Sequence, residues 1–278
     1  MMEISSSTTR PSTSFIAMLR DFWNHRHLLS RLVQRDVASR YRGSWMGILW
    51  SLLLPCVMLA VYLFVFGHVF IPVKSVGVDR SSDFVLSLFS GMLLHGMLAE
   101  CLGRAPAAIL SQPSYVKKVV FPIELLPMTV VGTATVQFLI GSSVLMIGLL
   151  FMQGLSAKVL LWPLVWLPLL AFSAGLTFMF SALTVYLRDL AQITGFLSTV
   201  LLFLSPVFYP LSSVSAELQQ WLLINPLTVP IEASRALLIN NSWPNPVMWS
   251  LHSLLCVLTL YIGWWIFQRT RRGFADVI

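Results

Sequence analysis

Long stretches without a charged residue constrain this chain more than any other feature. A helix needs about 20 apolar residues to cross the hydrocarbon core of a bilayer. Stretches free of Asp, Glu, Lys and Arg cover residues 45–73, 84–99, 125–157, 159–187 and 190–216, and a sixth lies within 247–268. Only 10% of the residues are charged, against about 25% in soluble domains. The pattern predicts an all-α integral membrane protein with six transmembrane helices.

The second stretch is the shortest of the six because Glu100 and Arg104 follow it. A helix over residues 84–99 reaches bilayer thickness only if it continues past Glu100. A carboxylate is costly in hydrocarbon. We therefore expect Glu100 to lie at the membrane interface or inside the protein.

The distribution of Lys and Arg predicts the orientation of these helices. If both termini are cytoplasmic, fourteen of the eighteen basic residues lie on the cytoplasmic side. The remaining four are Lys74, Arg80, Lys158 and Arg235. This asymmetry follows the positive-inside rule, and it accounts for the net charge of +7 without a nucleic-acid partner.

The part of the chain before the first span divides into two segments. Residues 1–24 are predicted to be a cytoplasmic lead-in, rich in Ser and Thr at its start. Residues 25–43 combine apolar side chains at helical spacing with a basic flank, which predicts an amphipathic helix along the inner interface. The apolar side chains are those of Leu28, Leu29, Leu32, Val33, Val37 and Tyr41. Residues 44–278 form the six-span domain.

Two connections between spans have patterns of their own. Residues 104–124 contain three prolines and end a possible docking helix with Lys117 and Lys118; a plain solvated loop is the alternative. Residues 206–246 contain an apolar stretch, 218–231, that is too short to span and is broken by Pro226 and Pro230. This outer connection is predicted to form two short re-entrant helices, because non-helical backbone at membrane depth must be buried in protein or line a wet cavity.

No catalytic or nucleotide-binding motif is present in the sequence. It contains no G-x-x-x-x-G-K, H-E-x-x-H or G-x-S-x-G pattern, and its five histidines are scattered singly. Cys56, Cys101 and Cys256 share no C-x-x-C spacing, so neither a disulfide nor a metal site is predicted. If ATP drives transport, ATP and Mg²⁺ must therefore bind a separate subunit and not this chain.

A few charged pairs and aromatic residues are candidates for function. Glu232 and Arg235 have the i, i+3 spacing of a helical pair, which is either a local structural ion pair or part of an exit gate. Arg188 and Asp189 lie in a short inner turn and are either structural or docking residues. Most aromatic side chains anchor the spans in lipid, but some can stack against sugar rings. The candidates for this role are Trp50, Tyr62 and Phe66 on the first span and Phe196, Phe203 and Tyr209 on the fifth.

Four ordered stretches resemble one family over nearly the whole chain. They read RYRGSWMGILW at residues 40–50, YVKKVVFPIELLP at 115–127, YLRDLAQITGFLSTVLLFLSPVFYP at 186–210 and NPLTVPIEASRALL at 225–238. The chain resembles the permease subunit of bacterial ABC exporters for O-antigen, capsule and teichoic-acid type polymers. The resemblance implies a homodimer in the bacterial inner membrane, bound to two copies of a cytoplasmic ABC ATPase, that exports a lipid-linked polysaccharide.

The resemblance also assigns parts to this chain. Residues 25–41 look like the family's interface helix and 111–121 like its coupling helix, so the ATPase would contact Ser114, Tyr115, Val116, Lys117 and Lys118. Arg188 and Asp189, in their inner turn, are further candidates for this contact. The connection 206–246 is similar to the family's re-entrant outer helices, with Asn225, Glu232 and Arg235 on the exit side.

A hydroxylated polymer needs a walled path, because each polar group stripped of water in hydrocarbon costs several kcal/mol. We expect the first and fifth spans of two copies to line this path, with Arg40 and Arg42 attracting the lipid-linked phosphate at the inner mouth. Two other functions stay open at this point: a lipid- or drug-exporting ABC permease, and a membrane-embedded glycosyl- or acyltransferase. The near absence of intramembrane acids disfavours the transferase.

Overall fold

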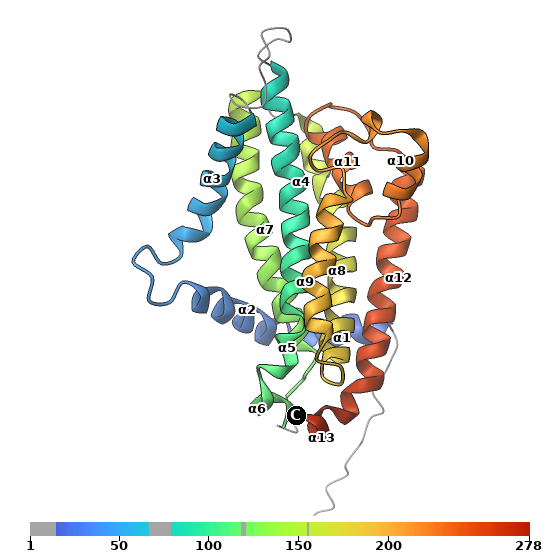
Figure 1. The fold of residues 1–278 in the computed structure, drawn as a ribbon. Coiled ribbons are helices and arrows are strands. Elements are labelled where there is room, and N and C mark those ends of the chain that lie inside the picture. Colours follow the sequence, from blue (N-terminus) through green and yellow to red (C-terminus); the bar gives the residue numbers. More distant parts are fainter. Residues whose placement is uncertain (1–14, 67–78, 118–120, 155) are drawn as a thin grey trace, which may run out of the picture.

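The computed structural model describes residues 15–66, 79–117, 121–154 and 156–278. Within these ranges all regular elements are helices, which confirms the predicted all-α class. Figure 1 shows the longer helices side by side in a bundle, with shorter helices gathered at its two ends. The longer helices are α3 (Leu49–Phe64), α4 (Asp79–Arg104), α7 (Leu125–Met152), α8 (Trp162–Thr184), α9 (Leu190–Phe203) and α12 (Pro246–Thr270).

Four helical segments are long and apolar enough to cross a bilayer. They cover residues 82–104, 125–152, 157–184 and 246–277 and match the predicted second, third, fourth and sixth spans. The third of them begins with the 3-10 helix η2 (Ala157–Leu161), which leads into α8. The chain is thus a multi-pass, all-α membrane protein.

The predicted first and fifth spans are shorter than expected. α3 has 16 residues and α9 has 14, which at 1.5 Å per residue extend about 24 and 21 Å along a core of roughly 30 Å. The uncharged stretch 190–216 is not helical throughout, because the helix ends at Phe203, shortly before the predicted connection 206–246. Pro206 and Pro210 follow, and proline has no backbone N–H with which to continue a helix. Part of the predicted first span, 67–73, lies outside the described residues.

α4 lies at the centre of the bundle. In the most apolar 18-residue segment of α4, 72% is buried inside the protein. The corresponding share in the other three candidate spans is 28–33%. Figure 1 shows it running between α7 and α9. The helix continues past Glu100, whose side chain is 18% exposed and pairs with two arginines. The expectation that Glu100 avoids lipid therefore agrees with the structure.

Two glycines bring α8 and α12 into backbone contact. A Cβ atom added at Gly175 would lie 2.5 Å from the carbonyl oxygen of Thr259, and one at Gly263 would overlap the carbonyl oxygen of Gly175. Small residues at helix crossings allow such close packing in membrane proteins. The α8–α12 crossing therefore has no room for a side chain at either position.

One end of the bundle carries the N-terminal helices. α1 (Phe15–Asn24) and α2 (Arg26–Arg40) lie across the longer helices, at the same end as the C-terminus (Figure 1). Met18 of α1 is 2% exposed, and the Phe22 ring lies 6.1 Å from Phe178 and 5.7 Å from Trp264, centroid to centroid. The second part of the predicted lead-in 1–24 is thus a packed helix, which the sequence analysis missed. We call this end of the molecule the α2 end.

The opposite end carries two short helices within the predicted connection 206–246. They are α10 (Ala216–Leu222) and α11 (Thr228–Leu238), preceded by the 3-10 helix η3 (Leu211–Ser213). Pro226 lies between α10 and α11, as the sequence indicates for a break. α11 is embedded in the bundle, with Ile231 and Leu237 at most 2% exposed.

Candidate functional site

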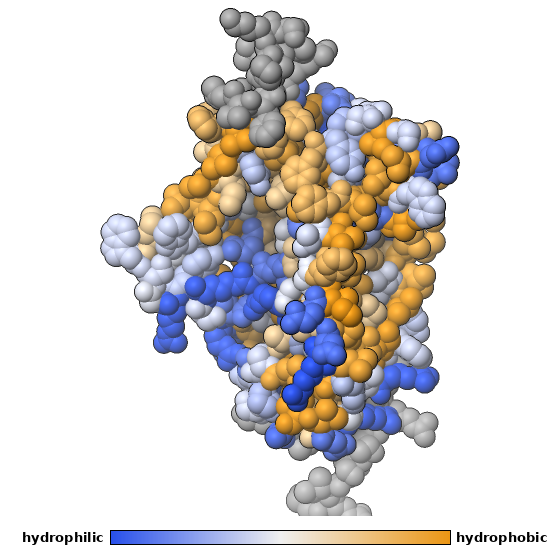
Figure 2. Space-filling view, in the orientation of Figure 1, coloured by the Kyte–Doolittle hydropathy of each residue, from blue (hydrophilic) through white to orange (hydrophobic). Residues whose placement is uncertain are grey.

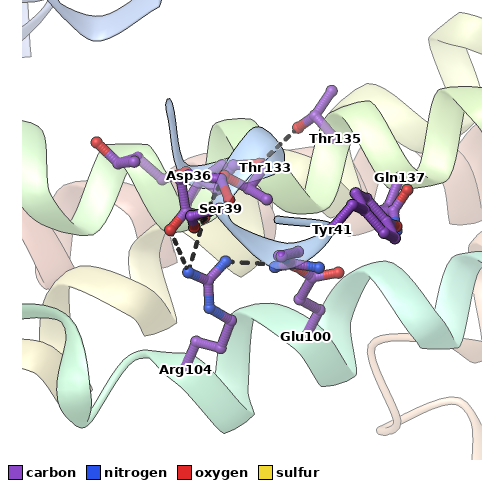
Figure 3. A network of polar contacts seen from close by, with 11 residues as sticks. Asp36, Ser39, Tyr41, Glu100, Arg104, Thr133, Thr135 and Gln137 are labelled. Atoms are coloured by element: carbon purple, nitrogen blue, oxygen red, sulfur yellow. Dashed lines mark hydrogen bonds and ion pairs between the residues drawn. The ribbon is translucent and has the colours of Figure 1, made fainter. Parts of the chain in front are cut away.

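Four charged side chains and one hydroxyl form a polar network at the α2 end (Figure 3). Arg104 of α4 donates to both carboxylate oxygens of Asp36 on α2, at 2.9 and 2.8 Å. Glu100 pairs with Arg40 of α2 and also, at 3.5 Å, with Arg104. The Thr133 hydroxyl of α7 donates to Asp36 Oδ2 at 2.8 Å. We call these five residues the α2 ion network; it joins three helices.

Helical spacing and one glycine explain how the network forms. Asp36 and Arg40 are separated by four residues, as are Glu100 and Arg104, so each pair lies on one face of its helix. α2 can approach α7 closely at Gly132, where an added Cβ would lie only 2.5 Å from Cγ2 of Val33. This approach brings Asp36 within reach of Thr133 and of α4.

The α2 ion network is electrically neutral because it contains two carboxylates and two guanidinium groups. Its charged side chains are 18–34% exposed, so they are partly desolvated. Arg40 was predicted to attract a phosphate together with Arg42. The structure pairs Arg40 with Glu100, sixty residues away in sequence, whereas Arg42 is exposed. The charge of Arg40 is therefore compensated within the protein, and Arg42 is the exposed cation of the two.

Sequence reasoning missed Asp36, Arg104 and Thr133 as parts of a site. Asp36 is the one acidic residue of the basic α2 sequence RHLLSRLVQRDVASR, and that isolation was an available signal. Its partner on α4, Arg104, could not be predicted from the sequence, because residues 36 and 104 are 68 positions apart.

The segment predicted to couple to an ATPase contacts α2. Connection 104–124 contains α5 (Ala107–Leu110) and α6 (Pro113–Val116). Arg35 of α2 donates to the Tyr115 hydroxyl at 2.9 Å, and its guanidinium lies 5.8 Å from the centre of the Tyr115 ring. Arg35 immediately precedes Asp36, so α6 is linked through α2 to the α2 ion network.

The predicted single helix over 111–121 is wrong in length. α6 covers only Pro113–Val116, because the non-helical backbone of Gln112 (φ −129°, ψ 50°) separates it from α5 and Lys117 already caps it. Ser114 and Lys117 are exposed and Tyr115 is half-buried, whereas Val116 is 5% exposed and packs in the apolar cluster of Ile109 and Phe178. A direct ATPase contact by the Val116 side chain does not fit this burial. Lys118 lies outside the described residues.

Arg188 and Asp189 lie in the turn between α8 and α9. Both side chains are exposed. The neighbouring Tyr186 hydroxyl donates to the Thr270 carbonyl at 2.8 Å, which fixes the turn against the end of α12. Arg271, just after α12, pairs with Glu124 at 3.3 Å. The turn 186–189 is thus held in place at the α2 end with its charged side chains directed to solvent.

The six aromatic residues proposed to line a sugar path divide into two groups. Trp50, Phe196 and Phe203 are 37%, 72% and 66% exposed on the surfaces of α3 and α9. Tyr62 and Phe66 pack towards α4, with Tyr62 6.3 Å from Phe89 and Phe66 5.6 Å from Phe84, centroid to centroid. Tyr209 is half-buried in the bend after α9.

Between α3 and α9 the surface is hollowed, with polar residues towards its α2 end (Figure 2) and a mainly apolar groove beside α3. Figure 2 shows these polar residues flanked by the hydrophobic surfaces of the two helices. A groove of about 320 Å³ lies between α3, α4 and α7 and is lined by Ser51, Tyr62 and Gln137 among apolar side chains. Gln137 donates to the Tyr41 hydroxyl at 2.7 Å, and its own carbonyl oxygen is buried without a hydrogen-bond partner among the described residues.

At the opposite end, Glu232 and Arg235 pair as their spacing predicts. Arg235 also donates to Ser87 Oγ of α4 at 2.7 Å and to the Pro206 carbonyl at 2.9 Å, and Glu232 accepts from the Leu211 amide at 3.1 Å. The pair therefore fastens α11 to α4 and to the bend after α9.

Asn225 fastens the same bend to the segment before α11. Its side chain donates to the Leu201 carbonyl of α9 at 2.9 Å and accepts from the Leu227 amide, also at 2.9 Å. In the described part of the chain, no group of three His, Cys, Asp or Glu side chains is arranged to hold a metal ion.

A bundle of apolar helices, with ion-paired charges at its ends, defines a multi-pass membrane protein. Comparison with known proteins gives its family: residues 27–239 match the ABC-2 type transporter family, and the chain belongs to that family. It is therefore the membrane subunit of a transporter.

Several relatives resemble the chain over most of its length. It is 30% identical to the O-antigen export system permease protein RfbA of Myxococcus xanthus, over 95% of this chain and 100% of that protein. It is 24% identical to a protein of the same name from Klebsiella pneumoniae, over 90% and 95% of the two chains. Its identity to the polysialic acid transport protein KpsM of Escherichia coli is 25%, over 84% and 89%.

Proposed function

We propose that this chain is the membrane-spanning subunit of an ATP-driven exporter that moves a lipid-linked polysaccharide across the bacterial inner membrane. The full-length likeness to the Myxococcus protein, named for O-antigen export, carries the proposal. KpsM, named for polysialic acid transport, extends the likeness to a second polymer. Relatives named for two different glycans favour a polysaccharide over a lipid or a drug.

We assign six crossings to the chain, with α3 and α9 as the first and fifth. An even number of crossings returns the chain to the side on which it began. In support, α1, α2 and the C-terminus lie at one end of the bundle (Figure 1). The basic residues concentrate in the segments that meet at this end, so the α2 end is the cytoplasmic one. α10 and α11 then lie on the exit side as re-entrant helices.

Two copies enclose the glycan path between their α3 and α9 surfaces. Only Ser51 and Leu59 of α3 and Thr194 of α9 are buried within one copy. Exposed apolar residues are satisfied by lipid, but polar groups in the hollow between these helices, Gln137 among them, are not. A second copy facing this surface would keep the hollow wet and away from hydrocarbon. Trp50, Phe196 and Phe203 would then face the sugars.

The α2 ends of the two copies are the docking faces for two copies of an ABC ATPase. The ATPase copies bind ATP and Mg²⁺. The exposed Ser114, Lys117, Arg188 and Asp189 form the contact surface. Movement of α6 is transmitted through the Tyr115–Arg35 hydrogen bond to α2 and then through Asp36 to α4. The ion pairs keep α2 joined to α4 during this movement, because leaving one charge unpaired is costly.

Deleting the gene for this chain in its host tests the proposal. Antibody against the cell's surface polysaccharide should then stain lysed cells but not intact ones, and a hydrolysis-deficient ATPase should reproduce this result. Restoring the chain should restore surface staining. Equal staining of intact cells with and without the chain would refute a role in polysaccharide export, and an altered lipid or drug efflux in the same cells would point to the rival substrates.

A further inference from the structure

A pocket at the exit end has the composition of a sugar-binding site. It occupies about 370 Å³ between α10, α11 and the start of α12, and its walls include Gln219, Glu232, Trp243, Asn245 and Trp249. Figure 1 places these three helices at the end opposite α2. Its volume lies in the lower part of the roughly 300–1,000 Å³ range of small-molecule sites. We call it the exit pocket.

The two tryptophans of the exit pocket are held by polar contacts. The Trp249 indole N–H donates to the Leu164 carbonyl at 3.2 Å, and the Trp243 ring lies 5.4 Å from Lys158 Nζ. Trp243 is nevertheless 69% exposed. Tryptophan is common at membrane interfaces in any case. Here, however, both rings belong to the wall of a cavity that also contains polar side chains, and an oriented aromatic face is what the C–H face of a pyranose stacks against.

Three polar side chains of the exit pocket are each fixed at one atom. Gln219 Nε2 donates to the Val214 carbonyl at 2.9 Å, Asn245 Oδ1 accepts from the amides of Val247 and Met248, and Glu232 Oε1 accepts from Leu211. Among the described residues, no hydrogen bond occupies Gln219 Oε1, Asn245 Nδ2 or Glu232 Oε2. The pocket wall therefore offers acceptors and a donor together, which suits hydroxyl groups because each hydroxyl both donates and accepts.

The charges around the exit pocket disfavour a phosphate. Arg235 neutralises Glu232 and is further occupied by Ser87 and the Pro206 carbonyl. Lys158 donates to the Asn241 carbonyl at 2.6 Å. Among the residues that the structure describes, the pocket wall itself contains no cation: Arg235 is paired with Glu232, and Lys158, which keeps its charge, lies outside the wall. A phospholipid headgroup would instead require an available cation.

We propose that the exit pocket binds a sugar ring of the emerging glycan and holds the polymer while the ATPase resets. This inference rests on the proposed export function and assigns it a further site. Glu232 and Leu211 both line the pocket and are joined by a hydrogen bond, so the pocket adjoins the segment that follows α9, a helix of the glycan path. A sugar ring held in the exit pocket opposes backward slippage of the glycan.

Saturation-transfer NMR of the purified full chain in nanodiscs tests the binding. The probes are the methyl pyranosides of glucose, galactose and mannose, with glycerol 1-phosphate as the headgroup analogue. At least one pyranoside should receive saturation, and Trp243→Ala should weaken its binding about tenfold. The matched control is Trp221→Ala, because Trp221 is 72% exposed on α10 but is not part of the pocket wall.

Asn245→Asp is a second variant that preserves folding. The aspartate keeps an oxygen that caps α12 and replaces the Nδ2 donor with a negatively charged acceptor, so pyranoside binding through this donor should fall about three- to tenfold. Binding of no pyranoside, equal binding by both pocket variants and wild type, or preferential binding of glycerol 1-phosphate would overturn the proposal.

Surface polysaccharide in cells separates this proposal from export itself. Trp243→Ala should lower the surface amount relative to Trp221→Ala, with lipid-linked polymer accumulating inside. Wild-type export by the Trp243→Ala and Asn245→Asp variants would remove the exit pocket and leave the export function standing. Export that does not need the chain at all would remove the export function instead.

Discussion

Exchanging Asp36 for Asn removes the carboxylate that joins α2 to α4 and α7 while keeping the size of the side chain. Asp36 accepts two contacts from Arg104 at 2.9 and 2.8 Å and one from Thr133 at 2.8 Å. A hydrogen bond to a charged group contributes about 1.5–3 kcal/mol. The side chains of Arg104 and Asp36 are 34% and 25% exposed, so solvent screens part of this energy. We expect Asp36→Asn to lower the free energy of unfolding by about 2 kcal/mol.

The charge balance predicts how this change combines with Arg104→Gln. Asp36→Asn leaves the α2 ion network with a net charge of +1, and Arg104→Gln leaves it at −1. The double variant is neutral again and retains the pair of Arg40 with Glu100. Its effect should therefore be smaller than the sum of the two single effects, by about 1–2 kcal/mol.

Unfolding of the purified protein by SDS in mixed micelles measures these energies, with helicity followed by circular dichroism. Arg42→Gln is the control, because Arg42 is exposed and its exchange should change the free energy of unfolding by less than about 0.5 kcal/mol. If the two single effects add to within about 0.5 kcal/mol in the double variant, Asp36 and Arg104 do not act as a unit and the reasoning is refuted.

Three further predictions concern other parts of the molecule. Gly263→Ala places a methyl group against the Gly175 carbonyl and should destabilise the bundle by about 3 kcal/mol in the same SDS titration. As the control, Gly96→Ala adds a methyl group in open space, so its free energy of unfolding should stay within about 1 kcal/mol of wild type. Cys56 is exposed and the other two cysteines are buried. If α3 lines a wet path, a charged maleimide should label Cys56 in proteoliposomes. Labelling by uncharged maleimides alone would place α3 against lipid. Tyr115→Phe removes the hydrogen bond with Arg35 and should lower substrate-stimulated ATP hydrolysis by up to about tenfold. The amount of ATPase that co-purifies should stay unchanged. Loss of co-purification would make Tyr115 a docking residue and not a coupling one.

The elements that the sequence predicts well are those determined by local composition. Uncharged runs identify α4, α7, α8 and α12, because each of these helices must be apolar over bilayer thickness whatever its neighbours are. Prolines likewise mark where α10 and α11 divide, since Pro226 cannot continue a helix. The uncharged run that contains α9 continues beyond Phe203, and there the prolines mark the end of the helix.

The features that the sequence analysis missed depend on contacts between distant segments. α1 has no long apolar run, and Phe22 becomes structural only because Phe178 and Trp264 are brought beside it. Arg40 looks like a free cation in the sequence, and only the crossing of α2 over α4 supplies Glu100. Residue spacing within one helix predicts pairs such as Glu232 with Arg235, but not the partners contributed by another helix.

The contrast between two contacts suggests which parts of a subunit move. At the α8–α12 crossing, backbone meets backbone at Gly175 and Gly263, so any sliding is blocked by atoms that cannot rotate away. In the α2 ion network, Glu100 is shared by two arginines and Arg104 by two carboxylates. When α2 shifts, an arginine of the network can therefore exchange one carboxylate for another, and no charge is left unpaired. Because the network is partly exposed, water can supply the hydrogen bonds that are lost. We expect α8 and α12 to act as the fixed frame, and α2 with the adjoining end of α4 to carry the movement imposed at α6.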